Sequence, residues 1–168
     1  AALTGHLLLS TLHTNSAAGA IPRFIAMGVR PFLLAPALNA VIGQRLVRRL
    51  CSACRKEKAL TENELADIQK IISVLPLQEK KNIPSDLIFY GPIGCEECNG
   101  LGYKGRVGVY EIMVVDDAIE KLILAGTGAA NDVEAAARSS GMLTMVEDGV
   151  LKALAGMTSL EEVFRVLQ

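Results

Sequence analysis

Four cysteines, arranged as two identical steps, constrain the fold of this chain more than any other feature of its sequence. Cys51 and Cys54 form the first Cys-x-x-Cys step, and Cys95 and Cys98 form the second. Each step lets two thiolates converge on one tetrahedral ion, and two steps complete a closed site of four sulfur ligands. The pattern predicts a structural zinc ion with no open coordination position for catalysis.

The spacing leaves other interpretations of the cysteines open. The 40 residues between the two steps exceed the roughly 15 to 20 that are typical of zinc ribbons. A longer loop raises the closure cost only logarithmically. The alternatives are a disulfide pair, two redox-active dithiols or four unrelated thiols. No feature of the sequence suggests secretion, and a thioredoxin-type site needs only one step.

Composition narrows the class of protein. The 168 residues are 51% hydrophobic with a net charge of -1, which excludes a disordered chain and argues against a dedicated nucleic-acid binder. The most apolar stretch, Pro31 to Gly43, has 13 residues, whereas a membrane-spanning helix needs about 20. The first residues have neither an initiator Met nor a charged region typical of a signal peptide. We expect the chain to be a fragment.

The first of three expected segments covers residues 1–50. The apolar run from Leu7 to Leu12 predicts a buried strand of a parallel sheet. Asn15 or Ser16 is expected to cap a helix that ends at Gly28 and has Pro22 as a kink or in its first turn. Pro31 is expected to open a second helix.

The second segment, 51–105, carries the metal site, and the third, 106–168, ends the chain. Thr61 and Glu64 predict a capping box at the start of an amphipathic helix. The β-branched strand Arg106–Val115 is expected to pair with Gln44–Leu50, so that the metal segment becomes an elaborated hairpin. The later helices are expected to be capped by Asp117, Asn131, Thr144 and Ser159, each with an acid three residues later, and to stop at Gly126, Gly141 and Gly156.

Two histidines flank the predicted first strand. Because His6 and His13 are seven residues apart, a strand would place them on opposite faces and exclude a shared metal. His13 would then lie at the carboxyl end of the strand, where open α/β sheets bind ligands. Thr11 and Asn15 beside it are hydrogen-bonding residues suited to a phosphate or a water molecule. The alternative is that His13 only bonds the neighbouring loop.

The segment around these histidines resembles the histidine box of the secretion ATPases, the motors of type II secretion and type IV pilus assembly. The resemblance continues in the family's order over most of the chain. Its residues are Thr4–Asn15, Arg23, Met27–Gly28, Pro31–Leu34, Gln44–Cys51, Cys95, Cys98, Gly102–Arg106, Tyr110–Ile112, Gly141–Met142 and Gly156–Val163. The four cysteines point to the assembly and secretion branch, because the similar pilus retraction motors lack them.

This resemblance implies an α/β fold: the C-terminal part of a RecA-like P-loop NTPase core (1–50), a zinc-binding insertion (51–105) and a final core strand with a helical subdomain (106–168). It implies a hexameric cytoplasmic ATPase that uses ATP and Mg²⁺ and works against a platform protein at the bacterial inner membrane. The family's box places His13 near the γ-phosphate as a sensor, and His6 matches the other box histidine, with a more structural role. From their chemistry and their place beside His13, Thr11 and Asn15 are expected to lie close to the nucleotide.

One departure from the family concerns the phosphate-binding loop. That loop needs the sequence Gly-x-x-x-x-Gly-Lys-Ser/Thr, and none of the 15 glycines here is followed by lysine. The Walker B acid would also precede residue 1 in the family's order. The fragment is therefore expected to be inactive alone, while its full-length parent hydrolyses ATP.

A basic run leaves a question about partners. Residues 44–58 hold six basic side chains and one acid, and from Glu111 onward ten acids face four basic residues. A contact with another subunit or with the platform protein is the favoured interpretation of this run. Two other classes remain: a zinc-stapled binding module like the cysteine-rich region of Hsp40-type co-chaperones, and a zinc-ribbon nucleic-acid adaptor, whose affinity would depend strongly on salt.

Overall fold

The structure is a computed structural model that describes residues 1–126 and 128–167. Its contacts divide the chain into two compact units. Unit 1 comprises Ala1–Gly43 and Glu111–Met142, and unit 2 comprises Gln44–Tyr110 and Leu143–Gln168. The boundaries between the three sequence segments, 50/51 and 105/106, both fall within the residues of unit 2. Helices and strands are mixed along the chain, which confirms an α/β fold in this general sense.

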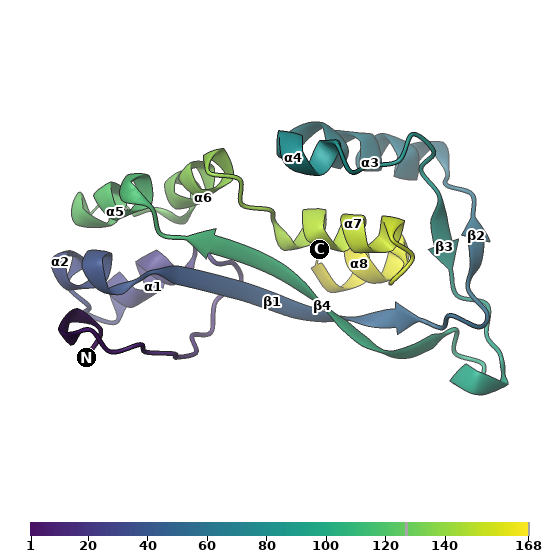
Figure 1. The fold of residues 1–168 in the computed structure, drawn as a ribbon, viewed down its shortest axis with the longest axis horizontal. Coiled ribbons are helices and arrows are strands. Elements are labelled where there is room, and N and C mark those ends of the chain that lie inside the picture. The colour runs from purple at the N-terminus through teal and green to yellow at the C-terminus, as the bar shows by residue number, and fades with distance from the viewer. Residues whose placement is uncertain (127, 168) are drawn as a thin grey trace. The chain divides into compact units, whose positions relative to one another are not determined.

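Two long strands form the principal sheet. β1 (Ala40–Leu50) pairs with β4 (Tyr103–Val114), and the two run in opposite directions (Figure 1). β1 begins four residues before the predicted start at Gln44, and β4 begins three residues before the predicted start at Arg106. Their pairing confirms the predicted hairpin, because the segment with the four cysteines connects the end of β1 to the start of β4.

Unit 1 is built from short helices around a small apolar core. Its elements besides the strand ends are η1 (Ala2–Thr4), α1 (Ala20–Ala26), α2 (Pro31–Leu34), η2 (Ala35–Ala37), α5 (Asp117–Leu124) and α6 (Ala130–Ser139). Ile21, Met113, Ile119, Ile123 and Val133 are fully buried in this core. The helix α5 packs against α2 and α6, and α6 packs against α1.

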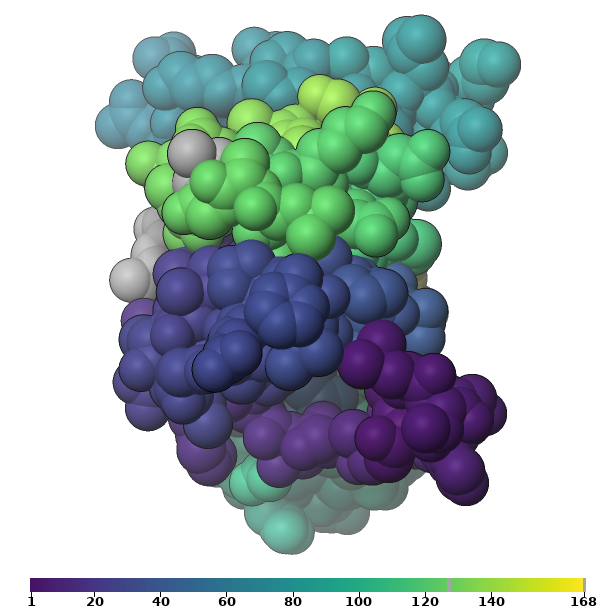
Figure 2. All heavy atoms as spheres, turned by 90° about the vertical axis from the view of Figure 1, so that its left-hand side faces the viewer, coloured from purple at the N-terminus to yellow at the C-terminus, as the bar shows by residue number. Residues whose placement is uncertain are grey.

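The prediction of a buried strand over Leu7–Leu12 is wrong. These residues have no regular secondary structure, and Leu7 and Leu9 are each 87% exposed. A parallel strand needs a neighbouring strand to complete its hydrogen bonds, and both sheets formed by the described residues have only two strands, neither of them this segment. In Figure 2 the dark purple residues at this end of the chain lie on the molecular surface.

Helix starts in unit 1 differ in part from those predicted. The cap of α1 is Gly19, and Pro22 sits in the first turn, where its missing N–H costs nothing. Pro31 opens α2 as expected. Asp116 caps α5 by accepting two backbone N–H groups, so the cap lies one residue before the predicted cap Asp117. The cap predicted at Asn131 is wrong, because α6 begins one residue earlier without a side-chain cap.

Unit 2 joins the cysteine-bearing segment and the C-terminal helices in one core. Its further elements are β2 (Lys56–Lys58), α3 (Glu62–Val74), α4 (Leu77–Lys80), β3 (Phe89–Gly91), η3 (Glu96–Cys98), α7 (Met145–Leu154) and α8 (Leu160–Leu167). β2 and β3 are antiparallel, with Glu57 opposite Tyr90. Ile68 of α3 packs with Phe89, Val150 and Val163, so the core is shared by elements far apart in the sequence.

Several local predictions for helix ends are confirmed. Thr61 with Glu64, and Thr144 with Glu147, form complete capping boxes. Ser159 Oγ accepts the Glu162 N–H at 3.3 Å, as expected of a cap. The predicted stop glycines all have the positive φ of a helix end: Gly126 at 69°, Gly141 at 96° and Gly156 at 70°.

None of the helices in the described part of the chain is both long and apolar enough to cross a bilayer.

Candidate functional site

The four cysteines meet at one point of unit 2, although 40 residues separate the two steps. The Sγ atoms of Cys51 and Cys95, of Cys54 and Cys98, and of Cys95 and Cys98 are each 3.8 Å apart. All four sulfur atoms lie within 4.8 Å of one another. Among the described residues this is the one group of three or more His, Cys, Asp or Glu side chains that could hold a metal ion.

The geometry fits a zinc ion. Sulfur ligands about 2.3 Å from a tetrahedral zinc lie about 3.8 Å from each other, which is the separation of three of the sulfur pairs. No disulfide links the cysteines, so all four thiols are available as ligands. The ligand set is complete, and a bound ion would therefore have a structural role.

Two glycines permit the tight turn around the second cysteine step. Gly94 has φ of 109°, and a Cβ atom there would lie 2.5 Å from the Gly100 carbonyl oxygen. Gly102 has φ of 72°, and a Cβ atom there would lie 2.4 Å from Pro92 Cβ. No other residue fits either position without moving the backbone. These glycines thus allow the chain to fold closely around Cys95 and Cys98.

The surroundings of Cys98 and Cys54 shift the pKa values of these two thiols in opposite directions. Burial raises the pKa of Cys98, but two backbone N–H groups donate to its sulfur, from Cys95 at 3.2 Å and from Gly102 at 3.1 Å. Together with the thiols of Cys95 and Cys54, these donors outweigh burial and lower the pKa of Cys98 to about 6. Burial and the neighbouring thiols raise the pKa of Cys54 to about 11. Amide donors of this kind are the outer hydrogen bonds that support thiolate ligands in metal sites.

The other predicted site residues lie in unit 1. His6 Nδ1 is 3.0 Å from Thr4 Oγ1, and the ring is exposed. Thr11, His13 and Asn15 are also exposed, on the segment without regular secondary structure. Because this segment is not a strand, the inference that the two histidines point to opposite faces has no basis in the structure.

Sequence reasoning missed a contact just beyond His13. The backbone N–H of Ala17 donates to Glu111 Oε1 at 2.6 Å across 94 residues of sequence. Glu111 is only 5% exposed and lies between the buried Val109 and Met113 on the inward face of β4. A carboxylate at an inward position of an alternating strand was the signal available in the sequence.

A second missed residue is Glu162 in unit 2. Its buried carboxylate accepts hydrogen bonds from the backbone N–H and the guanidinium of Arg48, at 3.0 and 2.7 Å, and from two nitrogens of Arg165. Burial raises the pKa of Glu162, but these donors outweigh it and lower the pKa to about 2. The Arg48 guanidinium also lies 4.2 Å from the ring centroid of Tyr103.

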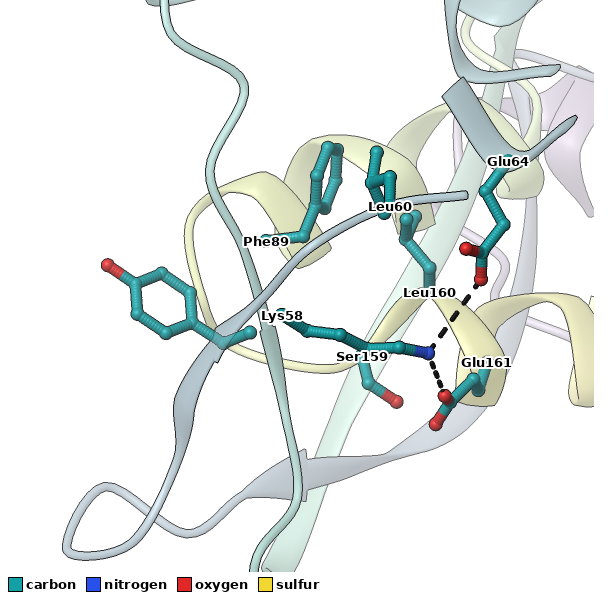
Figure 3. Close-up of a pocket in the computed structure, with 8 residues that line it drawn as sticks. Lys58, Leu60, Glu64, Phe89, Ser159, Leu160 and Glu161 are labelled. Atoms are coloured by element: carbon teal, nitrogen blue, oxygen red, sulfur yellow. Dashed lines mark hydrogen bonds and ion pairs between the residues drawn. The ribbon is translucent and has the colours of Figure 1, made fainter. Parts of the chain in front are cut away.

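Half of the basic run from 44 to 58 is engaged inside unit 2. Besides Arg48, Arg55 donates to the Gly156 carbonyl and stacks over Tyr90. Lys58 projects between the carboxylates of Glu64 and Glu161 at a small pocket (Figure 3). The distance from Lys58 Nζ to Glu64 Oε1 is 3.7 Å. Arg48 and Lys58 pair with acids of the same unit, and Arg55 bonds a backbone carbonyl there, which weakens the interpretation of the whole run as a binding surface.

Comparison with known proteins identifies the family. A model of the type II/IV secretion system protein family matches residues 1–165. The chain belongs to this family. The match includes the segment around both histidines and both cysteine steps, so the resemblance found in the sequence is confirmed, and the co-chaperone and nucleic-acid adaptor alternatives lose their support.

Curated relatives within the family have closely related names. The chain is 46% identical to the type IV pilus assembly ATPase PilB of Thermus thermophilus over 97% of its length, and 43% identical to the type II secretion system protein E of Aeromonas hydrophila over 99%. It is 41% identical to the PilB of Pseudomonas aeruginosa over 99%. The chain spans only 17%, 30% and 27% of these three relatives, respectively.

Proposed function

We propose that this chain is the C-terminal portion of a cytoplasmic ATPase that couples ATP hydrolysis to type II protein secretion or type IV pilus assembly. The observation that carries the proposal is the similarity over 97–99% of the chain to proteins named as ATPases or components of these machines. Residues 1–50 would belong to a RecA-like core, 51–105 to a zinc-binding insertion and 106–168 to the last core strand and a helical subdomain.

In this proposal the chain contributes a phosphate-sensing segment and not the phosphate-binding loop. His13 would lie near the γ-phosphate of ATP, where one hydrogen bond from an imidazole reads whether the phosphate is present. Thr11 and Asn15 would lie close to the nucleotide, and His6 would have a structural role. ATP and Mg²⁺ would be held mainly by residues outside this chain, since no glycine here precedes a lysine.

The metal site would serve the fold. Cys51, Cys54, Cys95 and Cys98 would hold one zinc ion, which supplies no reaction chemistry because its four positions are filled by sulfur. The separations of their sulfur atoms support this assignment. Structural zinc contributes about 10–16 kcal/mol of apparent binding energy in zinc-finger peptides, enough to hold the chain ends around the two steps.

The partners follow from the same family assignment. We propose a homo-hexamer that acts on a platform protein and associates with the bacterial inner membrane through its partners. No specific nucleic-acid partner is expected, because the net charge is -1 and the chain has no tryptophan.

Substitution of His13 in the longer protein tests the proposed site. With His13→Ala we expect ATP turnover to fall by about 10- to 1,000-fold while binding of a fluorescent ATP analogue stays within about threefold of the wild type. His6→Ala is the matched control on the same segment and should have the smaller effect on turnover. Unchanged turnover with His13→Ala would remove this residue from the mechanism.

A further inference from the structure

The segment that carries His13 has little regular hydrogen bonding of its own. Within the described residues of unit 1, no backbone–backbone hydrogen bond involves residues 7–16. His13 is exposed. Because the backbone has so few contacts of its own here, the direction of the His13 imidazole depends on whatever fixes the neighbouring residues.

Glu111 fixes the backbone at Ala17, which is four residues after His13 in the sequence. The Ala17 N–H donates to its carboxylate at 2.6 Å, and Ala17 is fully buried while Glu111 is 5% exposed. A buried carboxyl group is costly unless hydrogen bonds satisfy it, and the Ala17 N–H supplies one such bond. The geometry therefore ties the Ala17 backbone firmly to β4.

A short series of contacts connects this fixed point to the histidine. Ser16 Oγ accepts the Gly19 N–H at 3.2 Å, and Thr14 Oγ1 donates to the Ser16 carbonyl at 3.0 Å. The residues from 14 to 19 thus form one hydrogen-bonded turn, with the Ala17 amide anchored at its centre. Thr14 is the residue directly after His13.

We propose that Glu111 is a positioning residue for His13, which acts by anchoring the turn 14–19 to β4 and does not itself touch the nucleotide. This inference rests on the proposed function, because it assigns to Glu111 the task of directing the phosphate-sensing imidazole. Nothing in the sequence spacing connects these residues, since 94 positions separate Ala17 from Glu111.

The test compares three variants in the longer protein, using ATP turnover at varied ATP concentration. Glu111→Ala removes the acceptor, and we expect kcat to fall by about 10- to 100-fold, as for a misplaced catalytic group, with KM for ATP within about twofold. Glu111→Gln keeps an oxygen that can accept the Ala17 N–H and should restore most of kcat. The double variant Glu111→Ala/His13→Ala should have the same kcat as His13→Ala alone, because both changes remove the contribution of the positioned imidazole.

Asp116→Ala is the matched control. Asp116 is another unit 1 carboxylate that accepts two backbone N–H groups, but those groups belong to α5. Removal of the Asp116 carboxylate should lower the melting temperature and leave kcat unchanged. In the 168-residue chain, hydrogen exchange of the Ala17 amide should speed up by about tenfold or more with Glu111→Ala and remain slow with Asp116→Ala.

Three results would overturn the inference. These are an unchanged kcat with Glu111→Ala, an additive loss in the double variant, or a loss of ATP binding that follows the fall in melting temperature. The last result would mean that Glu111 only stabilises unit 1. If the wild-type longer protein has no ATP turnover, the proposed function itself fails, and the exchange of the Ala17 amide still reports on the anchor.

Discussion

At the level of single residues, two buried carboxylates connect distant parts of the sequence. Glu111 holds the backbone at Ala17, and Glu162 holds the backbone and side chain of Arg48 across 114 residues. A carboxyl group buried this deeply is costly unless hydrogen bonds satisfy it. Substitution of either carboxylate is therefore expected to have a large effect on stability, even where the new side chain is similar in size.

The paired Glu162 makes the stability of unit 2 depend on pH. Because its folded-state pKa is lowered to about 2 from 4.5, its contribution is complete above about pH 5 and is lost as the pH falls toward about 2. The shift corresponds to at most about 3 kcal/mol. We expect the free energy of unfolding, measured by urea titration, to fall over this interval.

The variant Glu162→Gln should be less stable at neutral pH by about 2–4 kcal/mol, because the two arginines lose their charged partner. The difference in unfolding free energy between the variant and the wild type should shrink as the pH approaches 3, where the wild-type carboxylate begins to be protonated. Glu161→Gln on the same helix is the control, since Glu161 is 52% exposed and should change stability by less than about 1 kcal/mol. A deficit for Glu162→Gln that is constant with pH would contradict the assignment.

The residues that the sequence made visible are those with a local signature. The four cysteines could be predicted as one site because a Cys-x-x-Cys step is itself a ligand geometry. Glu162 stands three residues after Ser159 and was interpreted as part of a capping box, yet its carboxylate bonds Arg48 and Arg165. Long-range partners of this kind have no local pattern, so they could not be predicted from one sequence.

At the level of elements, the turn between α7 and α8 is bound to residues beside the cysteines. The Leu50 N–H donates to the Met157 carbonyl at 2.9 Å, and the Thr158 hydroxyl donates to the Arg48 carbonyl at 2.8 Å. Tyr103 Oη and Ser159 Oγ are 2.7 Å apart. The end of β1 and the start of β4 therefore hold this turn, and the proposed zinc site would hold both strand ends.

Metal removal should therefore loosen more than the cysteine-bearing segment. The contacts just described predict that chelation of zinc also speeds hydrogen exchange in Gly156–Leu167, while the helices of unit 1 keep their exchange rates. The measurement is hydrogen exchange with and without a chelator, with the zinc content determined in parallel.

The conservative control for this experiment is Cys98→Ser, which should lose zinc and reproduce the exchange pattern of the chelated wild type. Slow exchange of Gly156–Leu167 after complete loss of zinc would show that the helical turn does not depend on the metal site. A chain that contains no zinc when purified from zinc-supplemented medium would contradict the metal assignment.

Helix ends were easier to predict than the strand at the start of the chain. Thr61, Thr144 and the stop glycines act through contacts within a few residues, so their patterns are reliable. The run Leu7–Leu12 has the composition of a buried strand but finds no neighbouring strand among the described residues. A strand depends on partners from elsewhere, and composition alone does not supply them.

At the level of the whole molecule, the exposed leucines are consistent with the proposed longer protein. Leu7, Leu8 and Leu9 are 64–87% exposed, and contiguous exposed apolar groups mark surfaces that another part of a protein covers. The relatives are several times longer than this chain. The proposed motor therefore needs both this chain and the residues that bind the phosphates.

The most direct measurement is ATP hydrolysis by two purified samples, the 168-residue chain and the longer protein that contains it. We predict no turnover above the blank for the chain alone, and turnover for the longer protein that increases with its assembly into hexamers. Hydrolysis by the chain alone that persists through purification and is saturable in ATP would contradict the account, as would a longer protein that assembles and binds ATP without hydrolysing it.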